Sequence, residues 1–177
     1  MPLSKWKKLS SSDVLENAWW TYKRDQYQLP SGKSGEYHYV HTNGASLVVP
    51  VSSDGKMVLV NQYRYLCDRE SLEFPCGGVK AGTTYDQTAV EELKEEGGYI
   101  ARDWKTVGEF NPYNGVTDEI CRVYVARNLT PVPARPDETE EFDIFLLSAD
   151  ELEARILSGV IWDGMTLAAW TIAKNYV

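Results

Sequence analysis

One stretch decides the fold of this 177-residue chain: residues 77–99, GGVKAGTTYDQTAVEELKEEGGY. A glycine-rich loop leads here into a segment with helical periodicity. Thr84 is followed three residues later by Gln87, which fits a capping box, and Gly97 with Gly98 supplies a stop. We therefore predict a helix over residues 84–96.

Three glutamates of this helix are predicted to share one face, since residues three and four apart are neighbours on a helix. They are Glu92, Glu95 and Glu96. Like charges at these spacings cost about 0.2–0.5 kcal/mol each, and a divalent cation would offset that repulsion. Carboxylate oxygens suit Mg²⁺ or Mn²⁺. Taken alone, the three glutamates also fit a solvated acidic helix face.

The rest of the chain alternates short apolar runs with turn residues, which predicts an α+β domain with a mixed sheet flanked by helices. An N-terminal antiparallel β appendage of about forty residues divides it into regions 1–43 and 44–177. Asp54-Gly55 predicts a hairpin turn between the strands on either side of it. Strands are expected over residues 18–23, 25–29, 36–41, 45–51, 57–63, 72–75, 104–110, 119–126 and 142–147, a loop over 127–141, and helices over 149–158 and 165–176.

Composition excludes several classes of protein. Lys and Arg number 18 against 26 Asp and Glu, a net charge of −8, which argues against partners such as duplex nucleic acid or an anionic membrane. Three cysteines without CxxC spacing and two histidines argue against zinc and a disulfide framework. The N-terminus has no apolar leader segment, and no apolar run is long enough to span a membrane. We expect a reduced, cytoplasmic protein.

Residues 72–83, LEFPCGGVKAGT, read as a strand entering the glycine-rich loop, and with the helix they resemble the Nudix hydrolases. The Nudix box reads G, five residues, E, seven residues, then REUxEExGU, where U is bulky and apolar. Gly77 begins the box, and residues 92–99 fit EUxEExGU. Thr83 stands where the first Glu belongs and Glu91 where the Arg belongs. The family pairs that Glu with that Arg, so the loss of both leaves no orphaned charge.

Four further segments resemble the ADP-ribose and nucleoside-diphosphate-sugar pyrophosphatase branch: MVLVNQYR (57–64), EFPCGG (73–78), ARPDETEE (134–141) and DGMTLAA (163–169). The resemblance implies a Nudix α/β/α sandwich that forms a homodimer through residues 1–43. It also implies Mg²⁺-dependent (or Mn²⁺-dependent) cleavage of ADP-ribose into AMP and ribose 5-phosphate. Two alternatives stay open: another substrate such as a GDP-hexose, and a non-catalytic nucleotide-sensing module, which the degenerate box suggests.

The same resemblance implies the metal ligands. Glu92 and Glu96 are the first choices, and Glu95 either bridges a second metal or orders a metal-bound water. The backbone carbonyl of the residue before the first Gly also binds metal in the family, which implies Cys76. A small buried side chain at Cys76 is compatible with this role, since only its carbonyl is used.

Substrate-binding and catalytic residues are implied in the same way. Arg64 lies where an arginine clamps the phosphates, a task that suits a bidentate guanidinium, although a surface arginine at a strand end is the simpler interpretation. In the loop before the strand at 142–147, Glu140 is the first choice for the base, with Glu141 and Glu138 behind it. A solubilising acidic loop is the alternative. Among the N-terminal aromatics, Trp19 and Tyr37 best match positions that stack on the base, while cross-strand packing explains most of the others.

Overall fold

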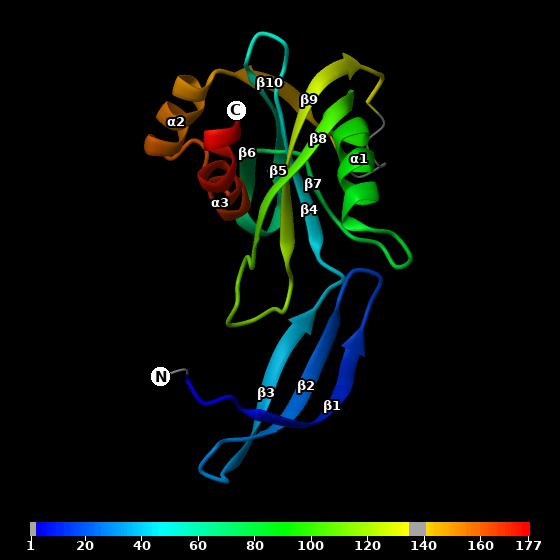
Figure 1. Ribbon diagram of the computed structural model, residues 1–177, viewed down its shortest axis with the longest axis vertical. Helices are drawn as coiled ribbons and strands as arrows, with labels where there is room; N and C mark the ends of the chain where they lie inside the picture. The colour runs from blue at the N-terminus through cyan, green and yellow to red at the C-terminus, as the bar shows by residue number, and fades with distance from the viewer. Residues whose placement is uncertain (1–2, 135–140) are drawn as a thin grey trace. The chain divides into compact units, whose positions relative to one another are not determined.

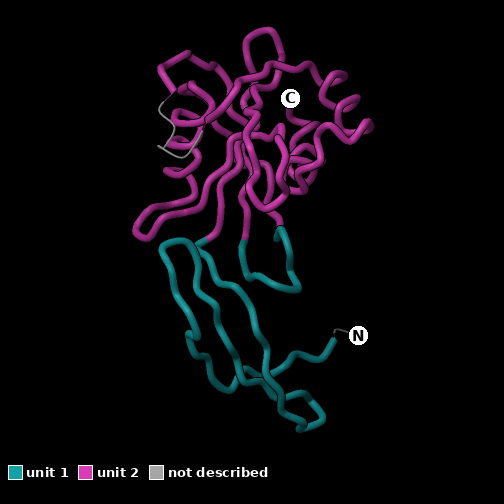
Figure 2. Tube along the Cα trace, turned by 180° about the vertical axis from the view of Figure 1, so that it is seen from behind, with its two compact units in different colours: residues 1–43, 111–119 teal, residues 44–110, 120–177 magenta. Residues whose placement is uncertain are grey.

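The computed structural model describes residues 3–134 and 141–177. The chain forms two compact units, coloured separately in Figure 2: residues 1–43 with 111–119, and residues 44–110 with 120–177. Within the described ranges, no helix combines the length and apolar character needed to cross a bilayer. The expected dimerisation role of residues 1–43 stays a prediction.

The first unit contains a three-stranded antiparallel sheet in the order β1-β2-β3 (Figure 1). Its strands are β1 (Lys7–Glu16), β2 (Thr21–Gln28) and β3 (Ser34–His41). The two strands predicted over residues 18–23 and 25–29 are thus one strand. A strand that begins at residue 18 is wrong, because Asn17 caps a turn there. Its Oδ1 accepts hydrogen bonds from the backbone N–H groups of Trp19 and Trp20, both at 2.9 Å.

In its described residues, the second unit contains two sheets, three α-helices and two 3₁₀ turns, whose arrangement Figure 1 shows. Only the β4–β9 pair is parallel among its strand pairs in the described residues, so the predicted mixed sheet is confirmed. One sheet has the order β7 (Cys76–Gly78), β4 (Ala45–Pro50), β9 (Cys121–Pro131), β8 (Tyr99–Phe110), and the other β10 (Asp143–Leu147), β5 (Met57–Arg64), β6 (Arg69–Glu73). The helical elements are α1 (Tyr85–Glu95), α2 (Ala149–Leu157), α3 (Gly164–Ala173), η1 (Tyr65–Cys67) and η2 (Lys174–Tyr176).

Strand β4 shows why helices cover both faces of the larger sheet. Every residue of β4 is buried, and successive side chains point to opposite faces. Val48 packs with Ala89 and Leu93 of α1. Its neighbours Leu47 and Val49 belong to the other apolar cluster, which includes residues of α3. A strand buried on both faces reads as a continuous apolar run, and the expected α/β/α layering is confirmed.

Two predicted connections differ from the structure. The turn at Asp54-Gly55 forms, with Gly55 N donating to Ser52 O at 3.0 Å, but β4 and β5 lie in different sheets and are linked by an isolated bridge. Strand β4 pairs instead with β7 and β9, which bury it fully. The predicted loop over residues 127–141 is wrong in its first part, because β9 continues to Pro131 against the long strand β8.

Candidate active site

The orientation of helix α1 is set by its first turn and its buried face. Thr84 Oγ1 accepts from Gln87 N at 3.2 Å, and Gln87 Oε1 accepts from Thr84 N at 3.0 Å, which confirms the predicted capping box. Leu93 is fully buried in the cluster between α1 and the sheet. Because Leu93 anchors the helix, Glu92 and Glu96 are carried beside the start of β7.

The carboxylate of Glu92 lies against the backbone of Gly77. A Cβ atom on residue 77 would stand 2.0 Å from Glu92 Oε1 and 2.2 Å from its Cδ, which is far inside van der Waals contact. Only glycine permits this approach. The first glycine of the box therefore lets a helix carboxylate reach the chain just after Cys76.

The carboxylate of Glu96 lies one residue earlier along the same backbone. Glu96 is 6% exposed, and its Oε2 accepts a hydrogen bond from Cys76 N at 2.9 Å. A buried carboxylate is costly without such a partner. Glu92 and Glu96 thus flank the Cys76-Gly77 segment, one helical turn apart.

The Cys76 thiol is kept neutral by its surroundings. A hydrogen bond with the Cys121 thiol, burial, and the negative charges of Glu96 and Glu92 raise the pKa of Cys76 well above its usual range. A neutral thiol is a poor metal ligand. This leaves the backbone carbonyl of Cys76 as the group that could bind a hard cation, and its role as a ligand stays a prediction.

The predicted ligands fit a divalent cation in their chemistry but do not form one cluster. Across the part of the chain that the structure describes, no group of three or more His, Cys, Asp and Glu side chains is arranged to hold a metal ion. The three glutamates of α1 are therefore not assembled into one cluster. Two carboxylates and a carbonyl still supply hard oxygen donors, and Mg²⁺ is commonly held by one or two carboxylates together with water and substrate phosphates. The carboxylates of Glu92 and Glu96 and the carbonyl of Cys76 are donors that suit Mg²⁺ or Mn²⁺. Glu95 is partly exposed, and its role as a metal ligand or catalytic residue stays a prediction.

Arg64 at the end of β5 is paired with a residue to which the sequence pattern assigned no role. Its Nε donates to Glu73 Oε1 at 2.8 Å, and a second guanidinium nitrogen donates to Glu73 Oε2. Glu73 is 3% exposed. A signal for it was present, because a carboxylate inside the apolar run Leu72-Glu73-Phe74 needs a partner.

The positive charge of Arg64 is stabilised by the carboxylates around it. The pKa of Arg64 is raised by its hydrogen bonds to Glu73 and by the attraction of the nearby carboxylates of Asp163 and Glu96, while burial of the guanidinium acts in the opposite direction. The predicted phosphate-binding role of Arg64 stays a prediction. Two of its guanidinium nitrogens are nevertheless already engaged by Glu73.

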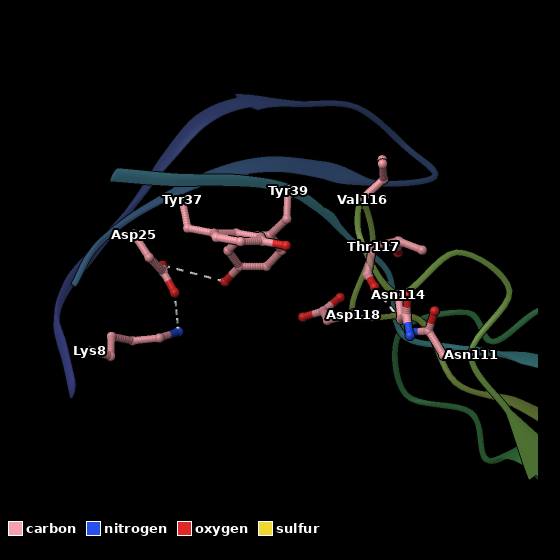
Figure 3. Close-up of a pocket in the computed structure, with 9 residues that line it drawn as sticks. All are labelled: Lys8, Asp25, Tyr37, Tyr39, Asn111, Asn114, Val116, Thr117 and Asp118. Carbon is pink, nitrogen blue, oxygen red and sulfur yellow. Dashed lines mark hydrogen bonds and ion pairs between the residues drawn. The ribbon is translucent and has the colours of Figure 1, made fainter. Parts of the chain in front are cut away.

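A cavity of about 390 Å³ lies within the first unit (Figure 3). Tyr37 and Tyr39 of β3 direct their rings toward it, and Tyr37 Oη donates to Gly115 O at 3.2 Å. A polar group closes one side, where Lys8 Nζ lies 2.5 Å from an Asp25 carboxylate oxygen. The remaining lining residues are Asn111, Asn114, Val116, Thr117 and Asp118.

The other predicted site residues are more scattered. Trp19 lies in the β1–β2 turn, is 81% exposed, and does not line the cavity. Glu141 is exposed just before β10, whereas Glu138 and Glu140 lie outside the described residues. At the degenerate box position, Thr83 Oγ1 donates to Lys80 O at 2.8 Å, so a local hydrogen bond satisfies its hydroxyl.

This chain is similar in sequence and in fold to several known proteins. A family model described as the NUDIX domain matches residues 40–166. The chain is 33% identical to a methanol dehydrogenase activator of Bacillus methanolicus, with 82% of this chain and 80% of the relative covered. It is 29% identical to an ADP-ribose pyrophosphatase of Bacillus subtilis (strain 168), with the same coverage. A solved structure of an ADP compounds hydrolase superposes with a TM-score of 0.85, covering 99% of this chain and 96% of that one; at 20% identity this likeness shows the fold.

Proposed function

The chain belongs to the NUDIX family of hydrolases, and we propose that it cleaves the diphosphate bond of ADP-ribose or a related nucleoside diphosphate sugar in the presence of Mg²⁺. The products would be a nucleoside monophosphate and a sugar phosphate. One observation carries the proposal: Glu92 and Glu96 flank the Cys76-Gly77 backbone. The ADP-ribose pyrophosphatase of Bacillus subtilis, matched over most of the chain, supports the substrate class.

Diphosphate hydrolysis requires that phosphate charge be neutralised and that a water be aimed at phosphorus. A bound Mg²⁺ would supply the neutralisation, held by the Glu92 and Glu96 carboxylates and the Cys76 carbonyl. Arg64, fixed by Glu73, adds positive charge at the border of this site. A carboxylate from Glu95, Glu140 or Glu141 would accept the proton of the attacking water as its oxygen bonds to phosphorus. The phosphate oxygen of the other product then leaves.

Tyr37 is the residue of the first unit that we propose for stacking on the base. Tyr37 offers a ring face, and base stacking on an aromatic ring is worth about 1–3 kcal/mol. The first unit also exposes apolar side chains that a second copy of the chain would cover in a homodimer. They are Trp6, Leu9, Val14, Leu15 and Trp19, each between 49% and 81% exposed. Trp19 would reach a base from across the two-fold axis, since it does not line the cavity of its own chain.

The experiment that tests the substrate assignment is a panel of nucleotide sugars incubated with the purified protein and Mg²⁺. ADP-ribose, ADP-glucose and GDP-mannose are compared, and the products are separated by chromatography. We expect AMP and ribose 5-phosphate from ADP-ribose at the highest kcat/KM. A higher kcat/KM for GDP-mannose would show that GDP-mannose, and not ADP-ribose, is the preferred substrate. If none of the compounds were hydrolysed, the result would favour a nucleotide-sensing module.

A further inference from the structure

Arg64 and Arg69 lie opposite each other on the adjacent strands β5 and β6. Arg64 ends β5, Arg69 begins β6, and the two are direct partners in the antiparallel pairing. Side chains at directly opposed positions project from the same face of a sheet, and like charges placed so are unfavourable without compensation. Each of the two guanidinium groups therefore needs a partner that compensates for this repulsion, and the two partners differ.

Arg64 takes its support from a carboxylate. Glu73 accepts hydrogen bonds from two of its guanidinium nitrogens, and Glu73 itself is 3% exposed. A bidentate contact with a phosphate uses the same fork geometry. Because Glu73 occupies that fork, Arg64 is poorly placed to clamp a substrate phosphate with two parallel hydrogen bonds.

Arg69 takes its support from an aromatic ring instead. Its guanidinium carbon lies 3.6 Å from the centroid of the Trp162 ring. Stacking on a ring holds the guanidinium plane but leaves its N–H groups directed outward. Among the described residues, no carboxylate forms an ion pair with Arg69. Its side chain is exposed, so an anion can approach it.

The ring beneath Arg69 is itself held in place. Trp162 Nε1 donates to Glu70 O at 3.0 Å, which ties the indole to β6. The next residue, Asp163, caps α3 by accepting from Thr166 N at 2.7 Å, and its carboxylate lies near Arg64. Because Arg69 is the direct strand partner of Arg64, the stacked pair lies beside Arg64 and its partner Glu73, three residues before Cys76 in the chain.

We infer that Arg69, presented by Trp162, binds the diphosphate of the substrate through its guanidinium fork, and that Arg64 is a positioning residue held by Glu73. This inference rests on the proposed function and assigns the phosphate contact to a residue that the sequence pattern did not single out. It needs no movement of the Arg64–Glu73 pair.

The test measures ADP binding by calorimetry in the presence of a chelator, so that neither turnover nor metal contributes. The variants are Arg69→Gln, Arg69→Lys and the matched control Arg155→Gln, since Arg155 lies over the Phe145 ring elsewhere in the second unit. We expect Arg69→Gln to weaken ADP binding at least about tenfold, the scale of a lost charge-assisted hydrogen bond. Arg69→Lys should recover part of the affinity, and Arg155→Gln should bind as the unaltered protein does.

Steady-state kinetics with ADP-ribose and Mg²⁺ give the second readout. Loss of a phosphate contact made in both ground and transition states raises KM about tenfold and changes kcat little, whereas a general folding defect lowers the active fraction and hence kcat. ADP binding by Arg69→Gln equal to that of the unaltered protein would overturn the inference, whatever the substrate. Weakened ADP binding in a protein that hydrolyses no nucleotide sugar would support the inference and reject the proposed function.

Discussion

Arg64 and Glu73 form a two-point ion pair in which the carboxylate is almost completely buried while the guanidinium side chain is 44% exposed. The exposed partner therefore neutralises a charge that water cannot reach. The segment from Glu73 to Gly77 runs directly into the candidate metal site. The ion pair therefore stabilises the end of β6, from which the chain continues to the Cys76-Gly77 segment of the candidate site.

Arg64→Gln is expected to destabilise the protein. The change leaves the Glu73 carboxylate buried without its partner, and because Arg64 is partly solvated we expect a loss of about 2 kcal/mol, below the full cost of breaking a buried pair. For a chain of this length, that corresponds to a melting temperature about 4–8 °C lower. Glu73→Gln in the same protein should recover much of the loss. A melting temperature that Arg64→Gln leaves unchanged would contradict the structural role of the pair.

Gly77→Ala tests the close approach of Glu92 to the backbone. The added methyl group would displace the carboxylate, and a misplacement of about 1 Å can cost about a hundredfold in rate. The matched control is Gly78→Ala, because a Cβ atom there meets nothing within 4 Å. We expect kcat/KM to fall strongly for the first variant and little for the second. Equal effects of both changes would show that the position of Glu92 is unimportant.

Thr83 and Glu91 are expected to be coupled when they are restored to the residues of the family pattern. Glu91→Arg alone should change activity little, because residue 91 is exposed on α1. Thr83→Glu combined with Glu91→Arg should add an ion pair with a favourable coupling of at least about 0.5 kcal/mol in a double-mutant cycle of unfolding free energies. Strict additivity of the two changes would refute the explanation that both partners were lost together.

Trp19→Ala and Tyr37→Ala are expected to raise KM for ADP-ribose more than they lower kcat, since stacking on the base is shared by ground and transition states. Trp20→Ala in the same turn is the control. Light scattering of the unaltered protein should report a dimer. An active monomer at micromolar concentration would remove the argument that Trp19 acts across a two-fold axis.

Local signals in the sequence predicted the elements around the site. The bounds of α1 were predictable, because they depend on residues of the helix itself. The capping box of Thr84 and Gln87 marks where the helix begins, and the spacing of its apolar residues shows how far it extends. The continuous apolar run of β4 likewise predicted a buried strand. These features depend on neighbours in sequence.

Features that depend on distant partners escaped prediction. The choice of β7 and β9 as partners of β4, instead of β5, is made by sheet pairing across the whole second unit. The Arg64–Glu73 pair depends on the register between β5 and β6. Asn17 is the exception, because its contacts are local: its side chain accepts two backbone hydrogen bonds and turns the first residues of the predicted strand over 18–23 into a turn. In the first two cases the deciding contact joins residues that are distant in the sequence.

Metal-dependent hydrolysis at Glu92 and Glu96 is tested by the rate of ADP-ribose hydrolysis by the unaltered protein and by Glu96→Gln, with Mg²⁺ and with excess chelator. Glu91→Gln is the matched control, since it removes an exposed carboxylate from the same helix. The proposed metal site predicts that chelation abolishes turnover, that Glu96→Gln lowers kcat at least about a hundredfold, and that the kcat of Glu91→Gln stays close to that of the unaltered protein. Hydrolysis that persists in chelator, or near-normal turnover by Glu96→Gln, would contradict it.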